Sequence, residues 1–313
     1  MANNPMRVPE RERRVGGFLV GRLLPFRARR QVGPFTFIDH MGPSEVGPGQ
    51  YFDVDQHPHI GLSTLTYLLE GEVYHRDSAG GDRVITPGSV NLMTAGRGCT
   101  HTERTPAAFR QNGARGRLHG YQVWVALPRE REEMAPRFDH VDAEDLPRWR
   151  EGPFDLAVVA GEGYGRRSPL PAYAPLFMVD ATAARGAGTL DVAGQLRGEI
   201  AVVVVAGGAR VGGEAIGAGE MLISLADDTC CLDLAAGARV LLFGGPPLPE
   251  PRYLDWNFAS SSRARLRRAR ADWRAWRPGR DADSAFGLGV PGDATYIPLP
   301  GEPARPAEGG VTS

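Results

Sequence analysis

Two stretches of the chain share one succession of short apolar runs and glycine turns. The first begins at Thr64 with TLTYLLEGEVYHRDSAGGDRVITPGSVNLM, and the second begins at Glu199 with EIAVVVVAGGARVGGEAIGAGEMLIS. Runs of alternating apolar residues that end in Gly or Pro are typical of short β-strands and their turns. Gly71 of the first stretch corresponds to Gly207 of the second. We therefore expect a duplicated β unit.

This pattern predicts an all-β fold, with two antiparallel sandwiches or barrels and one helix near the C-terminus. The length of 313 residues also agrees with two domains. We expect the following division: an N-terminal β unit over 1–135, a charged linker over 136–152, a C-terminal β unit over 153–250, a helix and return segment over 251–297, and a flexible tail over 298–313.

The helical pattern lies in SSSRARLRRARADWRAWRPG, where a serine can cap the helix and Pro278 ends it. The apolar positions at helical spacing are Leu266, Ala269, Trp273 and Trp276. The arginines of segment 263–277 allow two interpretations. They could bind nucleic acid or a protein partner, or they could be the solvated face of an amphipathic helix that docks through its tryptophans. We favour the second, because blocks of charge are usually solvated.

Composition and charge narrow the classes of function. The formal net charge of −1 gives no field that would attract nucleic acid or an acidic membrane, so we expect neither as a direct partner. The longest apolar run, IAVVVVAGG, is too short to span a bilayer. Cys99, Cys230 and Cys231 do not form a disulfide framework, and we interpret the adjacent pair as small buried apolar residues. We expect a cytoplasmic protein, since the N-terminus also lacks the apolar core of a signal peptide. Two units with a docked helix favour a monomer.

The histidines are distributed unevenly between the two units. All seven lie in the first 140 residues: His40, His57, His59, His75, His101, His119 and His140. His57 and His59 share one face of an extended segment, and so do His101 and Glu103, because residues i and i+2 of a strand point the same way. If the two strands are neighbours, three imidazoles and one carboxylate converge. This donor set suits a divalent transition metal.

A structural interpretation of these residues stays open, in which His57 and His59 cap a loop and His101 bonds a neighbour. We expect His75 to be exposed or paired with Asp77. We place His40 in a turn, with a position in the barrel cavity as the alternative. The remaining two, His119 and His140, are expected at a surface or an interface.

Several motifs in order resemble the pirin family of the cupin superfamily. They are HPHIGLSTLTYLLEGEVYHRDSAGG, PGSVNLMTAGRGCTHTE, LHGYQVWVALP, GPFTFIDHMGP, LLFGGPPLPEP and WNFASSS. The resemblance implies a bicupin, built from two double-stranded β-helix barrels, with one metal held in the N-terminal barrel by His57, His59, His101 and Glu103. The implied metal is Fe(II), with Mn, Ni, Cu or Zn as alternatives. Ser63 stands where many cupins place a further glutamate, which affects the shape of the pocket.

The resemblance also implies a flavonol dioxygenase of the quercetin 2,3-dioxygenase type. Its partners would be dioxygen and a small aromatic, flavonol-like substrate, with Glu103 as the catalytic base and Leu65, Tyr67 and Met93 as an apolar wall. Two alternatives remain. The first is a redox- or metal-dependent regulator that acts through a protein partner without turnover. The second is a non-catalytic metal-binding bicupin whose cavity binds a small molecule.

Overall fold

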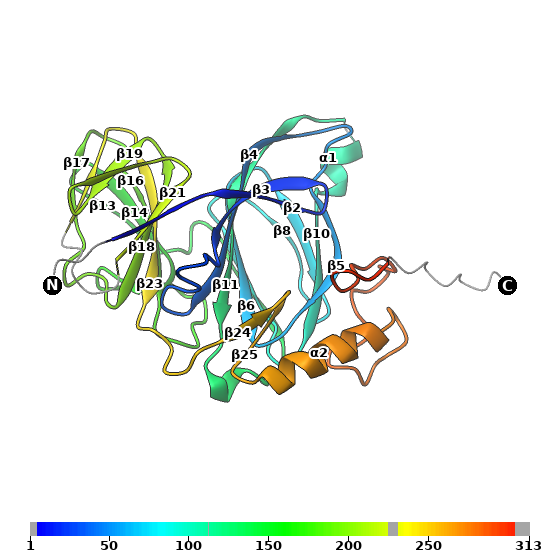
Figure 1. Cartoon of the computed structure of the whole chain (residues 1–313). Coiled ribbons are helices and arrows are strands. Elements are labelled where there is room, and N and C mark those ends of the chain that lie inside the picture. The colour runs from blue at the N-terminus through cyan, green and yellow to red at the C-terminus, as the bar shows by residue number, and fades with distance from the viewer. Residues whose placement is uncertain (1–4, 112, 225–230, 304–313) are drawn as a thin grey trace.

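The computed structural model describes residues 5–111, 113–224 and 231–303. Two β-barrels lie side by side, and a helix covers one end of the first barrel (Figure 1). Strands therefore dominate the described part of the chain, and the predicted all-β bicupin fold is confirmed. No helix of the described residues is long and apolar enough to cross a membrane.

The first barrel consists of a large and a small antiparallel sheet. The large sheet runs in the order β12 (Arg137–Val141), β9 (Val90–Thr94), β6 (Leu62–Glu70), β11 (Gly116–Ala126), β4 (Phe35–Val46), β3 (Phe18–Leu24) and β2 (Arg11–Val15). The small sheet runs in the order β5 (Asp53–His59), β10 (Cys99–Arg104), β7 (Val73–Asp77) and β8 (Asp82–Ile85). A short helix, α1 (Ala107–Gln111), follows β10, and a 3-10 turn spans Arg129–Arg131.

The second barrel repeats this plan. Its large sheet runs in the order β1 (Met6–Pro9), β21 (Glu220–Ser224), β18 (Glu199–Ala206), β23 (Arg239–Gly245), β16 (Phe177–Thr182), β14 (Phe154–Gly163) and β13 (Arg148–Glu151), and β15 (Arg166–Arg167) pairs with β14. Its small sheet runs in the order β17 (Gly188–Asp191), β22 (Cys231–Leu234), β19 (Gly208–Val211) and β20 (Glu214–Gly217). The matched turn glycines, Gly71 and Gly207, both have positive φ, which glycine adopts without steric cost.

The chain crosses between the barrels at two places that the sequence interpretation missed. The N-terminal strand β1 pairs with β21 of the second barrel and buries Val8 completely, so 1–135 does not form one unit. The expected linker 136–152 contains two strands. Of these, β12 pairs with β9 in the first barrel and β13 pairs with β14 in the second. Both are edge strands that carry several charged residues. Their sequences therefore lack the regular alternation of apolar and polar residues by which a strand is predicted.

The large sheets of the two barrels pack face to face. One buried apolar cluster contains Leu65 and Tyr121 of the first barrel together with Val203 and Phe243 of the second. Phe35 meets Phe243 edge to face, with ring centroids 5.5 Å apart. The first barrel's large sheet is thus buried on both faces, one toward the second barrel and one toward its own interior.

Helix α2 (Arg263–Ala275) agrees with the sequence prediction. The Ser262 hydroxyl caps it by accepting a hydrogen bond from the backbone N–H of Arg265 at 3.4 Å. Trp273 and Trp276 are buried against the hairpin of β24 (Tyr253–Asp255) and β25 (Phe258–Ser260) and the return segment. Several arginines of the helix form surface contacts, such as the ion pairs of Arg265 with Glu133 and Arg270 with Asp255. The amphipathic interpretation of segment 263–277 agrees with this packing.

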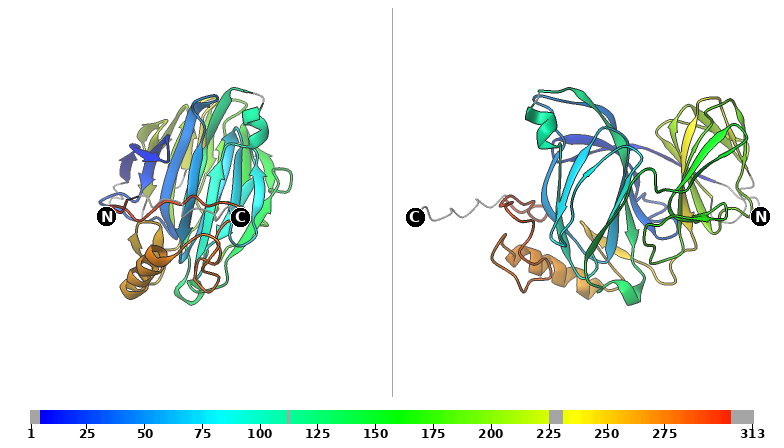
Figure 2. Two further views of the ribbon diagram at one scale, coloured as in Figure 1. Left: turned by 90° about the vertical axis from the view of Figure 1, so that its right-hand side faces the viewer. Right: turned by 180° about the vertical axis from the view of Figure 1, so that it is seen from behind.

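After the helix, the return segment crosses the outside of the first barrel beside β5 (Figure 2). The backbone carbonyl of Ile297 accepts a hydrogen bond from the indole of Trp273 at 3.0 Å. Leu299 is buried, so the first residues of the expected flexible tail are packed. The rest of that tail, 304–313, lies outside the described residues.

Candidate metal centre

Strands β5 and β10 are hydrogen-bonded neighbours, as the metal hypothesis required. His101 stands opposite His57 in the register, and Cys99 stands opposite His59. The side chains of all three histidines point into the first barrel, and their relative exposures are 6% for His57, 1% for His59 and 0% for His101. The interpretation of His57 and His59 as loop caps is therefore wrong, because both lie within a strand and face the interior.

The three imidazoles converge at metal-ligand spacing. One ring nitrogen of each lies within 4.8 Å of the others. The Nε2 atoms of His59 and His101 are 3.1 Å apart, and the ring centroids of His57 and His101 are separated by 4.3 Å. His57 Nδ1 donates to the backbone carbonyl of Asp55 at 2.9 Å, which leaves its Nε2 lone pair for a ligand.

Burial sets the charge of this cluster. It lowers the pKa of His57, which nearby Glu103 partly opposes, and it holds the pKa of His59 and His101 well below the usual value. The rings are therefore neutral at neutral pH. Neutral imidazole is the form that ligates a transition metal, so these residues fit a divalent cation.

Glu103 lies beside the three histidines rather than among them. Its carboxylate groups with His75 and His101, again within 4.8 Å, while it is absent from the group of three imidazoles. The pairing of β10 with β5 shifts register between His101 and Glu103, a bulge that the sequence pattern could not show. Gln122 Nε2 donates to Glu103 Oε1 at 2.6 Å.

Two aromatic residues that the sequence interpretation overlooked form the wall of this site. Trp124 meets His59 edge to face at 5.1 Å between ring centroids, and Phe37 stacks on Trp124 at 3.9 Å. Trp124 and Gln122 alternate along β11 in the stretch YQVWVA. That period of two could have identified them, had the inward face of the strand been known.

The predicted apolar wall is wrong for two of its three residues. Leu65 and Tyr67 face the second barrel, and the Tyr67 hydroxyl donates to Asp180 there at 2.8 Å. The inward face of β6 carries Thr64 and Thr66, which stand opposite Trp124 and Gln122. Met93, opposite Thr64, does point inward. Ser63 bonds Thr94 at 3.0 Å.

The other predicted histidine positions are settled as follows. His40 lies within β4, neither in a turn nor in the cavity, and its Nε2 is 2.9 Å from Nε2 of buried His119 at the joint between the barrels. His140 lies on edge strand β12 and bonds Asp142 at 2.9 Å. His75 is buried and paired with Asp77, so its exposed alternative is wrong. Cys231 is half-buried, and Cys230 lies outside the described residues.

The second barrel has apolar residues at the matching positions. Its small sheet has the same strand order as that of the first barrel, and Leu232 occupies the register position of His101. By the same pairing Leu190 corresponds to His57 and Leu234 to Glu103. These leucines belong to the buried core of the second barrel. Within the described ranges, the candidate metal groups lie in the first barrel alone.

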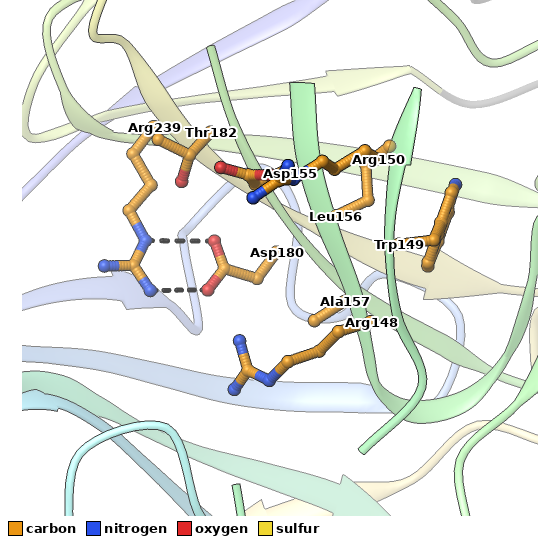
Figure 3. A pocket seen from close by; sticks show the side chains of 9 residues that line it. All are labelled: Arg148, Trp149, Arg150, Asp155, Leu156, Ala157, Asp180, Thr182 and Arg239. Carbon is orange, nitrogen blue, oxygen red and sulfur yellow. Dashed lines mark hydrogen bonds and ion pairs between the residues drawn. The ribbon is translucent and has the colours of Figure 1, made fainter. Parts of the chain in front are cut away.

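A cavity of about 540 Å³ lies at the joint between the barrels, away from the histidine cluster. Its lining includes Arg148, Asp155, Asp180 and Arg239 (Figure 3). Asp180 binds Arg239 through two hydrogen bonds, and Asp155 pairs with Arg150. Because these charged groups largely pair with one another, we interpret the cavity as part of the packing between the barrels rather than as a binding site.

Two barrels of this topology, with one buried histidine cluster, define a metal-binding bicupin. Family comparison agrees: residues 17–125 match the Pirin family, and residues 178–279 match the Pirin C-terminal cupin domain. The chain belongs to the pirin family.

One curated relative and two solved structures illustrate the match. A pirin-like protein of Caulobacter vibrioides is 45% identical over 270 residues, which is 85% of this chain and 92% of the relative. The crystal structure of a quercetin 2,3-dioxygenase from Acinetobacter baumannii has a TM-score of 0.84 and 32% identity, and it covers 96% of each chain. The bacterial pirin YhhW from Escherichia coli, solved in complex with nickel(II), shares the fold at 20% identity, with a TM-score of 0.59 over 78% of this chain and 100% of that one.

Proposed function

We propose that this protein is a metal-dependent dioxygenase that acts on flavonol-like substrates of the quercetin type. The observation that carries the proposal is the convergence of three buried, neutral imidazoles next to one carboxylate in the first barrel. Similarity along 96% of the chain to a quercetin 2,3-dioxygenase of known structure supports the choice of reaction.

His57, His59 and His101 would hold the cation, with Glu103 as the neighbouring carboxylate that completes the donor set. We propose Fe(II) as the metal, with Mn, Ni, Cu or Zn as alternatives, since imidazole sites do not select strictly by affinity. When bound, the cation would supply Lewis acidity that stabilises the negative charge of a deprotonated flavonol hydroxyl.

The chain itself contributes a base and an apolar wall. Glu103 is 2% exposed, and Gln122 holds its Oε1, so Oε2 is the oxygen that would leave the donor set and accept the proton of the substrate hydroxyl. Trp124 and Phe37 line the same side of the barrel and exclude water from the reacting groups. Exclusion of water strengthens every electrostatic interaction within the site.

Oxygen uptake with quercetin, measured together with metal content, tests this proposal. The change His101→Ala should abolish both. His140→Ala is the matched control, because His140 lies on an edge strand outside the cluster, and it should keep both. If the parent protein holds one metal and consumes no oxygen with a panel of polyphenols, the dioxygenase proposal fails and the regulatory alternative gains support.

The role of Glu103 has a separate test. Gln122→Leu removes the donor at 2.6 Å from the buried carboxylate. A hydrogen bond to a charged group contributes about 1.5–3 kcal/mol, so kcat should fall roughly 10- to 100-fold. Metal content should stay at the parent value, because the three imidazoles are untouched. Full activity in this variant would rule out a positioned Glu103 base.

A further inference from the structure

A hydrogen-bonded chain runs outward from His101, on the edge of its ring that faces away from His59. His101 Nδ1 is 3.4 Å from His75 Nδ1, and His75 Nε2 is 2.8 Å from Asp77 Oδ2. The other oxygen, Asp77 Oδ1, accepts hydrogen bonds from the backbone N–H groups of Ala79 and Gly81, both at 2.8 Å. Relative exposure is 2% for His75 and 1% for Asp77, so water does not compete for these contacts.

We propose that His75 and Asp77 are positioning residues that fix the ring orientation and tautomer of His101 for the bound cation. The inference rests on the metal site of the proposed function, and it assigns roles to two residues outside the ligand set. It follows from the direction in which each hydrogen bond along the chain must run.

Asp77 determines which atom donates in each hydrogen bond of this chain. Two backbone N–H groups already donate to Oδ1, and Oδ2 is the acceptor for His75, so Nε2 of His75 carries its proton. The Nδ1 atom of His75 is then the acceptor toward His101. The proton of the neutral His101 ring must lie on Nδ1, which leaves a lone pair on Nε2, the nitrogen that faces His59. Metal-bound histidines typically donate their second ring N–H in this way, and such partners influence metal affinity.

The surroundings hold this chain in place. Phe138 stacks on the His75 ring, with centroids 4.9 Å apart and planes at 22°. A Cβ atom at Gly81 would lie 2.2 Å from Asp77 Oδ2, so the loop can close around the carboxylate only with glycine at that position. Phe138 belongs to β12, the strand within the expected linker, which gives that segment a part in the site.

The second barrel supplies an internal comparison. By strand register Ala209 takes the place of His75, and Val211 takes the place of Asp77. Both are buried in the apolar core there. Where the ligand positions are apolar, the outer positions are apolar too. If His75 and Asp77 served only to close the hairpin, their counterparts in the second barrel would not need to be apolar wherever the ligand positions are apolar.

The structure also suggests a competing role, because His75 groups with His101 and Glu103 as potential ligands. In that case His75 would bind the cation directly. Its loss would lower the number of ions bound or the coordination number, rather than weaken an otherwise unchanged site. The two roles therefore give different results when binding is measured at saturating metal.

Titration of the whole chain with Co(II) distinguishes the positioning role of His75 from the ligand role. The test variant is Asp77→Asn, which keeps the shape of the side chain but cannot accept at both ends, since one oxygen becomes an N–H donor. The matched control is Asp82→Asn on the same hairpin, where the side chain is 60% exposed and bonds Tyr74. The readouts are the dissociation constant from chelator competition, the visible Co(II) spectrum, and the paramagnetically shifted N–H signals of the ligand histidines.

We expect Asp77→Asn to bind one Co(II) with roughly 10- to 100-fold weaker affinity, as for other partners of metal-bound histidines. One shifted N–H signal should exchange faster with water, and Asp82→Asn should match the parent. A dissociation constant within twofold of the parent, with unchanged signals, overturns the inference. Loss of stoichiometry or of a ligand field band in His75→Phe makes His75 a ligand and also overturns it. If the parent and Asp82→Asn bind no metal, the metal site itself fails.

Discussion

Asp180 is a buried carboxylate at the joint between the barrels, and its loss should destabilise the fold measurably. Its Oδ1 accepts from Arg239 Nε at 3.0 Å (Figure 3). Its Oδ2 also accepts from the Tyr67 hydroxyl of the first barrel at 2.8 Å. Burial and this carboxylate together raise the pKa of Tyr67 far above its usual value, so the phenol remains a donor. The change Asp180→Asn keeps the volume and turns one acceptor oxygen into a donor.

The expected loss of unfolding free energy in Asp180→Asn follows from the burial of the ion pair. Breaking a fully buried ion pair costs about 3–5 kcal/mol, because one charge is left without its partner. The Arg239 side chain is 30% exposed, so water can solvate the unpaired guanidinium and reduce this cost. We therefore take about 2 kcal/mol for the ion pair. Loss of a good acceptor for Tyr67 adds about 1 kcal/mol. The sum is about 3 kcal/mol of unfolding free energy.

Urea unfolding followed by circular dichroism measures this loss, provided that the denaturant slope is unchanged. Asp155→Asn is the control, because that carboxylate borders the same cavity but is 44% exposed, and surface pairs contribute 0–1 kcal/mol. The double variant Asp180→Leu with Arg239→Met should recover most of the stability, since no charge is left unpaired. The reasoning fails if Asp180→Asn is as stable as Asp155→Asn.

Three further predictions concern other parts of the molecule. Burial lowers the pKa of His119 to about 4, and the ordinary value is 6.5, so the unfolded chain binds more protons between these values. Stability should therefore fall as the pH drops from 6.5 to about 4, and His119→Gln should flatten that slope in urea titrations; parallel slopes would contradict this. Burial raises the pKa of the Cys99 thiol to about 12, so peptide mapping should find it alkylated far more slowly than half-buried Cys231 in the native protein, and equal rates would be evidence against burial. Trp273→Ala should lower the free energy of unfolding by about 3–5 kcal/mol in thermal or urea experiments, and the exposed control Arg267→Ala should lower it by under about 0.5 kcal/mol. A small loss in the tryptophan variant would mean that the helix is not docked.

The sequence was sufficient for the duplicated unit and for the imidazole cluster, because both depend on local regularities. A period of two places His57 and His59 on one face of β5, and the pairing of β5 with β10 brings His101 opposite His57. The cap of α2 at Ser262 and its apolar spacing are similarly local. Such features survive in the fold because nothing from a distant segment competes with them.

Features that depend on distant segments could not be predicted in the same way. Strand β6 is buried on both faces, so its alternation of threonine with apolar residues does not show which face is inside its own barrel. The assumption that apolar residues point inward placed Leu65 and Tyr67 in the cavity, whereas the second barrel covers them. Only the pairing of whole domains reveals this. The same holds for β1, which joins a sheet more than 200 residues away in the sequence.

The contrast between the barrels suggests how the same topology supports two kinds of interior. In the second barrel Leu190, Leu232 and Leu234 fill the space between the sheets and stabilise it by apolar burial. In the first, polar side chains occupy the matching positions, and each needs a partner to offset its burial. Hydrogen bonds supply that partner for Glu103 and His75, while three converging imidazole lone pairs face one another. A cation that binds the folded barrel and not the unfolded chain adds stability by mass action. The first barrel should therefore gain stability with metal concentration, and the second should not.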